Sequence, residues 1–114
     1  FATMKPFNAP LPSGAQPAPL WGDESHVRAL FGDAVADVTA VRETIRIDRF
    51  RDGREFREYF RTHYGPTIAV YNRNADDPDQ VAALDAALDA LGDSALGSDG
   101  AMEWEFLLLT ATVR

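Results

Sequence analysis

Residues 103–114 read EWEFLLLTATVR, and this stretch decides how the sequence is expected to fold. Its centre, Phe106-Leu107-Leu108-Leu109, is apolar at consecutive positions, so side chains on both faces of a strand would be apolar. Strands with this pattern lie in the middle of a sheet that is covered on both sides. We therefore predict a strand over residues 103–114 that is buried on both faces.

A second strand is predicted over residues 38–50, where the hydrophobic period changes to two. Apolar and polar side chains fall on opposite faces there, the apolar ones being Val41, Ile45 and Ile47 and the polar ones Arg42, Thr44, Arg46 and Asp48. This alternation indicates one buried face and one face in water.

The two predicted strands do not make a complete sheet, because a central strand needs a neighbour on each edge for its backbone groups. Residues 38–50 are the one convincing partner in the sequence. The missing neighbour is expected from an N-terminal part outside this sequence, from a second copy, or from the proline-rich residues 1–20. The last source is the poorest, since each proline removes a donor from the ladder.

The chain is expected to have a connector followed by a domain. Residues 1–20 contain five of the seven prolines, which favours an extended connector, and residues 21–114 form the predicted domain. The domain opens with a short helix between Trp21 and Gly32.

Helices are predicted between the two strands, over residues 53–94. An aromatic stripe at helical spacing comprises Phe56, Tyr59, Phe60, His63 and Tyr64. A later amphipathic helix has Asp77 as its N-cap and Pro78 behind it, and Gly92 is expected to end it. The run of arginines from residue 42 to residue 61 is interleaved with acids, which predicts a solvated, salt-bridged surface.

Composition limits the class of protein. The 114 residues suit one domain, and the net charge of −7 disfavours nucleic acid and anionic membrane surfaces as partners. No apolar run is long enough for a membrane span, no signal peptide is recognisable, and there is no cysteine, which together favour a cytoplasmic location. Because the first residue is Phe1, we expect the numbering to begin inside a longer polypeptide.

Four segments together resemble the end of a bacterial class I S-adenosylmethionine-dependent methyltransferase. They are PxxLWGDExHVRxLFGD at residues 17–33, VRETIRIDRF at 41–50, FREYFRTHYGPT at 56–67, and the terminal apolar strand. The resemblance implies an α/β fold with a Rossmann-like sheet, in which residues 38–50 and 103–114 are the antiparallel strands six and seven. Residues 53–94 are then a helical insertion, and the isolated chain would look α+β.

The resemblance also implies a cofactor that this chain does not hold by itself. The family binds S-adenosylmethionine with a Gly-rich loop and a following acid, and no G-x-G-x-x-G spacing occurs here. We therefore expect this fragment to lack methyltransferase activity alone, while the longer parent binds S-adenosylmethionine and a small-molecule acceptor.

Three aromatic residues are candidates for the acceptor side of such an enzyme. His63 could accept a proton beside Tyr64, or it could be a hydrogen-bonded residue at the core or its rim. Trp21 could line a substrate pocket, or it could pin a loop to the core. Two histidines without acids at ligand spacing predict no metal site.

The alternative to a methyltransferase fragment is a non-catalytic α+β interaction domain. Its open sheet edge would then pair with a second copy across a dimer axis. A cleaved fragment that dimerises would satisfy both interpretations.

Overall fold

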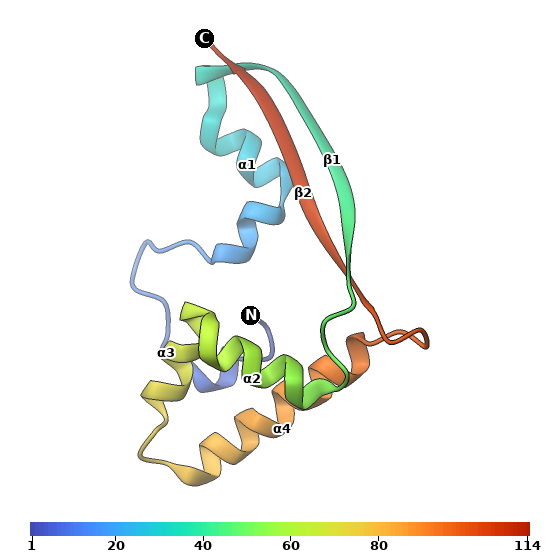
Figure 1. The fold of residues 1–114 in the computed structure, drawn as a ribbon. Helices are drawn as coiled ribbons and strands as arrows, with labels where there is room; N and C mark the ends of the chain where they lie inside the picture. Colours follow the sequence, from blue (N-terminus) through green and yellow to red (C-terminus); the bar gives the residue numbers. More distant parts are fainter. The chain divides into compact units, whose positions relative to one another are not determined.

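The computed structural model describes all 114 residues and contains four α-helices, three short 3₁₀-helices and two strands. In chain order they are η1 (Lys5–Phe7), η2 (Ala18–Gly22), α1 (Glu24–Phe31), η3 (Gly32–Ala34), β1 (Val35–Ile47), α2 (Gly53–His63), α3 (Gly65–Arg73), α4 (Pro78–Ala95) and β2 (Met102–Val113). The strands form one antiparallel sheet (Figure 1). The α+β architecture predicted for the isolated chain is therefore confirmed.

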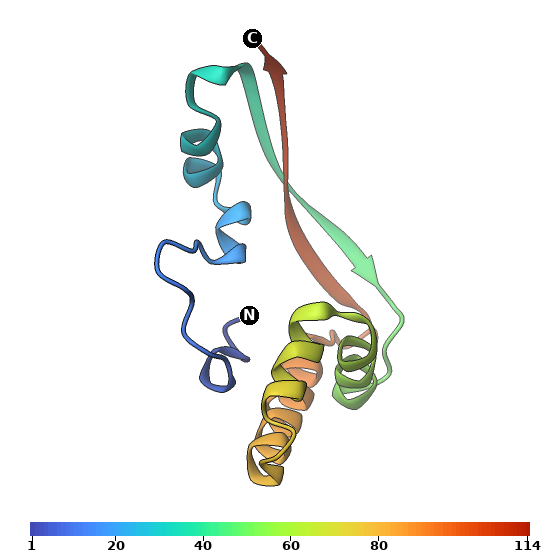
Figure 2. The same cartoon turned by 90° about the vertical axis from the view of Figure 1, so that its left-hand side faces the viewer.

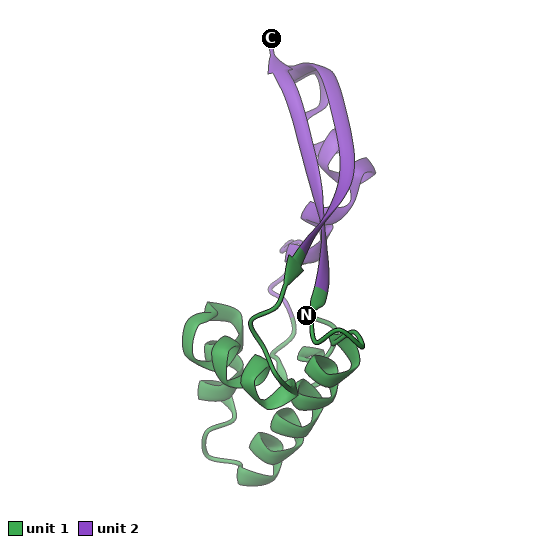
Figure 3. Ribbon diagram, turned by 45° about the vertical axis from the view of Figure 1, so that its right-hand side comes forward, with its two compact units in different colours: residues 1–10, 46–102 green, residues 11–45, 103–114 purple.

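The chain divides into two compact units, coloured separately in Figure 3. The helical unit comprises residues Phe1–Pro10 and Arg46–Met102 and holds α2, α3 and α4. The sheet unit comprises Leu11–Ile45 and Glu103–Arg114 and holds α1 with nearly all of both strands.

The core of the helical unit joins the first residues of the chain to α3 and α4. It consists of Met4, Val70, Tyr71, Leu84 and Leu88, with Phe7 and Val81 packed against it. The side-chain amide of Asn74 donates to the Phe7 carbonyl at 3.0 Å and ties the two segments together. Burial of Met4 thus anchors residues 1–10 to the helices.

The proline-rich segment is less extended than predicted. Residues 5–7 and 18–22 form 3₁₀ turns, in which the amide of Phe7 donates to Met4 and that of Leu20 donates to Pro17. Proline suits such turns because its fixed φ matches their first position and its missing N–H is not required there. The segment between these turns, residues 8–17, contains no helix or strand.

The start of α4 follows its predicted capping residue, Asp77, but its end does not follow the prediction. Asp52 accepts from the amide of Glu55 at 2.8 Å, and Asp77 accepts from the amide of Gln80 at 3.1 Å, so both are N-caps. The prediction that Gly92 ends its helix is wrong, because α4 continues to Ala95. Gly92 is instead buried inside the helix, where its missing side chain allows close packing against α2.

The sheet unit pairs β1 with β2 over most of their length (Figure 2). The amide of Arg114 donates to the Ala34 carbonyl at 3.1 Å, and Arg42 pairs with Glu105 at 2.8 Å. Each strand begins within three residues of its predicted position. Asp37 interrupts the regular extended geometry of β1, since its φ of 52° lies in the left-handed region.

Within the sheet unit, no element covers the face of the sheet predicted to be buried. Val41, Ile45, Phe106 and Leu108 are 42% to 51% exposed. On the opposite face, the guanidinium of Arg42 donates to the Gly22 carbonyl of η2, so η2 approaches the face on which the side chains of β1 are polar. The expected burial fails because two strands alone supply no layer to cover the apolar face.

Candidate functional site

Three features of the structure are candidates for function: a charged cluster between the helices, an apolar cavity in the same unit, and the open sheet. The charged cluster centres on Arg57 of α2, which is only 7% exposed. Its Nε donates to Asp89 at 2.6 Å, and one terminal nitrogen reaches Asp85 at 3.0 Å and Glu58 at 2.9 Å. The prediction of a solvated arginine surface is therefore wrong for Arg57.

Tyr71 of α3 extends the cluster to the third helix, because its hydroxyl donates to the Asp85 carboxylate at 2.5 Å. Burial raises the pKa of Tyr71 above its ordinary value, and the hydrogen bond and negative charge of Asp85 add to this effect. The pKa of Arg57 is also raised: burial opposes its charge, but Asp89, Asp85 and Glu58 together outweigh that penalty. Tyr71 is thus neutral and Arg57 charged at neutral pH.

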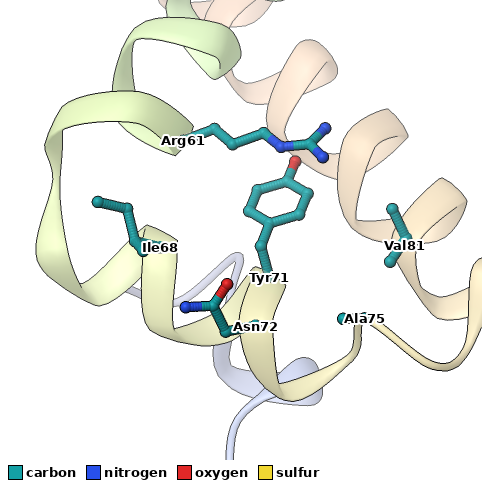
Figure 4. Close-up of a pocket in the computed structure, with 6 residues that line it drawn as sticks. All are labelled: Arg61, Ile68, Tyr71, Asn72, Ala75 and Val81. Atoms are coloured by element: carbon teal, nitrogen blue, oxygen red, sulfur yellow. The ribbon is translucent and has the colours of Figure 1, made fainter.

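A cavity of about 280 Å³ adjoins this cluster and is lined by Arg61, Ile68, Tyr71, Asn72, Ala75 and Val81. Figure 4 shows the Arg61 guanidinium near the hydroxyl end of Tyr71, with Val81 across from it on α4. The guanidinium carbon lies 4.4 Å from the centre of the Tyr71 ring, within the range of a cation–π contact.

The charges around this cavity indicate that the cluster holds the helices together. Three carboxylates, those of Glu58, Asp85 and Asp89, surround Arg57, and Arg61 is the second cation, 3.9 Å from Asp85. The excess of negative charge disfavours an anionic ligand, and the carboxylates already have guanidinium partners. The cluster therefore connects α2, α3 and α4 and offers no free catalytic group.

A second cavity, called here the apolar cavity, has a volume of about 190 Å³. It is lined by Phe1, Thr3, Met4, Phe56, Phe60, Tyr64, Thr67, Leu88 and Leu91. No charged side chain lines it. The aromatic stripe predicted from the sequence supplies three of these residues, because α2 turns Phe56 and Phe60 toward α4 and Tyr64 follows at the end of the helix.

The candidate residues named from the sequence are placed in different surroundings. Tyr64 is half-buried in the wall of the apolar cavity, with its ring 5.5 Å from that of Phe60. His63 is exposed at the end of α2, with its ring 4.8 Å from Tyr59, and does not line the cavity. Trp21 belongs to the sheet unit and is 62% exposed. That these residues face an acceptor stays a prediction.

Sequence reasoning missed Arg57 and its acidic partners, although a signal for them was present. Asp85 and Asp89 each follow a core leucine, Leu84 and Leu88, with the same four-residue spacing. Acids repeated at that spacing beside an apolar stripe form a row at the edge of the helix interface. Such a row indicates that a cation from a neighbouring helix is needed there.

Comparison with known proteins connects the chain to longer mycobacterial proteins. The uncharacterized protein Rv1403c of Mycobacterium tuberculosis, strain H37Rv, is 42% identical over 110 residues, or 96% of this chain and 40% of the relative. The uncharacterized protein Rv1405c of the same strain is 39% identical over 113 residues, or 99% of this chain and 41% of the relative. The chain thus spans about two fifths of the length of these relatives. No family model and no solved structure matches it.

Two further properties bear on the site. No helix has the length and apolar character needed to cross a membrane. No group of three or more His, Cys, Asp or Glu side chains is arranged to hold a metal ion.

Proposed function

We propose that this chain is the closing part of a class I S-adenosylmethionine-dependent methyltransferase whose acceptor is a small organic molecule. In this proposal β1 and β2 are strands six and seven of a larger Rossmann-like sheet, and α2, α3 and α4 are inserted between them. S-adenosylmethionine binds to the rest of the parent protein, so the chain by itself transfers no methyl group.

The observation that carries the proposal is the open apolar face of the sheet, formed by Val41, Ile45, Phe106 and Leu108. Four large apolar side chains exposed on one face of a two-stranded sheet are unfavourable in water. A further layer and a further strand would remove both the exposed apolar area and the unpaired edge of β2.

The length of the relatives supports a source for that missing layer. About three fifths of Rv1403c and Rv1405c lies outside the matched region. A segment of that size is large enough for a dinucleotide-type domain, which typically needs on the order of 150 residues. The resemblance of residues 17–33 and 56–67 to methyltransferase sequences favours that type of domain over others.

A binding measurement tests the proposed function. Calorimetry with S-adenosylmethionine is compared for the 114-residue chain and for complete Rv1403c. We expect binding to the complete relative and none to the chain. If complete, folded Rv1403c binds neither S-adenosylmethionine nor S-adenosylhomocysteine, the methyltransferase proposal is wrong.

A substitution tests whether the open face is covered in a longer protein. Leu108→Lys in the isolated chain should leave its stability within about 0.5 kcal/mol, because the side chain is already exposed there. The same change in a polypeptide that includes the missing layer should destabilise it by roughly 3 kcal/mol or more, since it buries an unpaired charge. Leu11→Lys, at an exposed position outside the sheet, is the matched control.

The same open face supports a second candidate function, an interaction domain that pairs with a copy of itself. In this case β2 would extend the sheet across a two-fold axis and cover the apolar face of its partner. Light scattering and hydrogen exchange of the amides of Leu107, Leu108 and Leu109 separate the two candidates. Amides that face β1 are protected in either case, so a monomer in which the amides at the free edge of β2 exchange rapidly contradicts self-pairing of the isolated chain.

A further inference from the structure

The apolar cavity has features of a binding site that the proposed methyltransferase function does not use. The helical unit exposes two large apolar side chains, Phe1 and Leu91, and both line this cavity. The rest of that unit therefore buries its large apolar side chains at least partly. Exposed apolar area concentrated at one concave place is typical of a ligand site.

The wall of the cavity is built from aromatic rings held at defined angles. The Tyr64 ring meets Phe60 edge-on, with centroids 5.5 Å apart and planes at 78°. It meets Phe1 in the same manner, at 6.3 Å and 76°. Phe56 and Phe60 are in closer contact, with centroids 4.6 Å apart. Edge and face positions of these rings suit a further aromatic ring in the cavity.

The polar side chains that line the cavity are few and uncharged, and the one charge at its wall is the α-ammonium of Phe1. The Tyr64 hydroxyl makes no hydrogen bond within the chain. The Thr67 hydroxyl has only the sulfur of Met4 as a partner, at 3.5 Å, and sulfur is a weak acceptor. The hydroxyls of Tyr64 and Thr3 are therefore available to a ligand, since that of Thr3 also makes no hydrogen bond within the chain, and no side chain offers a charge.

We propose that the apolar cavity binds a molecule without positive charge that carries a single aromatic ring with one hydrogen-bonding substituent. The volume of about 190 Å³ fits this class, because a cavity of roughly 150 Å³ lined by apolar side chains accommodates benzene. No acidic side chain lines the cavity, so nothing at its wall would pair with an ammonium group on a ligand. The Tyr64 hydroxyl supplies the hydrogen bond that orients the substituent.

Fluorine NMR with para-fluorophenol tests the proposal on the 114-residue chain. We expect broadening and a shift of the fluorine signal, together with amide shifts confined to residues 1–7, α2, α3 and α4. Leu91→Glu places a charge at the cavity wall and should weaken binding at least about tenfold. Ala90→Glu is the matched control, because it adds the same charge on the same helix at an exposed position that does not line the cavity.

A second variant tests the hydrogen bond separately from the shape. Tyr64→Phe keeps the ring and removes the hydroxyl, so para-fluorophenol should bind about threefold to tenfold more weakly. Fluorobenzene, which has no hydroxyl, should bind equally to both proteins. If Tyr64→Phe weakens the binding of both probes equally, the substitution has only disturbed the position of the ring. The role assigned to the Tyr64 hydroxyl is then wrong.

The proposal fails if the folded chain does not broaden the para-fluorophenol signal, or if Leu91→Glu binds it as well as the original chain. It also fails if a second copy occupies the cavity. In that case light scattering would show a dimer that persists when the phenol is added. Circular dichroism of Leu91→Glu confirms that the helices are retained, and none of these measurements depends on S-adenosylmethionine.

Discussion

Gly92 of α4 lies against Gly53, the first residue of α2, so closely that a Cβ on Gly92 would stand 2.6 Å from the Gly53 Cα. The amide of Gly53 also donates to the Asp93 carboxylate at 2.6 Å. The N-terminal end of α2, where its free amides point, therefore meets a negative charge on α4. Gly53, Gly92 and Asp93 thus allow the backbones of α2 and α4 to come into contact.

We predict that Gly92→Ala destabilises the helical unit by roughly 1–3 kcal/mol, because the added methyl group overpacks the contact with Gly53. The cost of overpacking has to exceed the gain of about 1 kcal/mol that alanine brings to a helix relative to glycine. Urea unfolding measures the difference. Gly22→Ala is the control, since open space surrounds that position and no proline follows it, and its stability should be about equal. An equally stable Gly92→Ala would contradict the close contact.

Replacement of Arg57 by methionine is expected to leave Asp85 and Asp89 without their buried cation. We predict a loss of roughly 2–3 kcal/mol in the free energy of unfolding, below the value for a fully buried pair because both carboxylates are partly in water. Arg51→Met removes a pair with Glu55 in which the arginine is largely exposed, and should leave stability almost unchanged. Similar losses for both variants would show that burial of Arg57 is unimportant.

The raised pKa of Tyr71 predicts a stability change in alkaline solution. The folded state holds the proton to higher pH than the unfolded chain, whose tyrosine pKa is 10.0. The stabilisation is therefore complete below that pH and is lost as the pH rises toward the folded pKa. Tyr71→Phe should be less stable at neutral pH, because it loses the hydrogen bond to Asp85, and its stability should fall less steeply above pH 10. Urea unfolding on both sides of pH 10 checks this, and an unchanged slope would contradict it.

The N-cap of α4 provides a prediction about a single hydrogen bond. Asp77→Ala removes the acceptor for the Gln80 amide and should lower the free energy of unfolding by roughly 1 kcal/mol. Asp76→Ala removes the same charge one residue earlier, outside the cap, and should have an effect of a few tenths of a kcal/mol. Thermal unfolding of the two variants should separate them clearly. A larger effect from Asp76 would contradict the assigned cap.

The local elements could be predicted because their signals are local. Asp52 and Asp77 cap helices through bonds to amides three residues later, and the apolar run at residues 106–109 marks a strand wherever it is placed. The sites are less accessible to such reasoning. The exposure of His63 and the place of Tyr64 in a cavity wall depend on which helices meet α2, and periodicity within α2 does not contain that information.

The sequence by itself determined the α+β order of elements, the capping residue Asp77 and the mismatch between an apolar terminal strand and its single partner. Only the tertiary structure decided that Gly92 is a helix contact, that Arg57 is buried, and that the open face of the sheet is the apolar one. The physical reason is the distance along the sequence over which each kind of interaction acts. Capping bonds and strand alternation act between near neighbours in the chain, whereas the burial of a glycine or an arginine depends on segments about 30 to 40 residues away, such as α4 against α2.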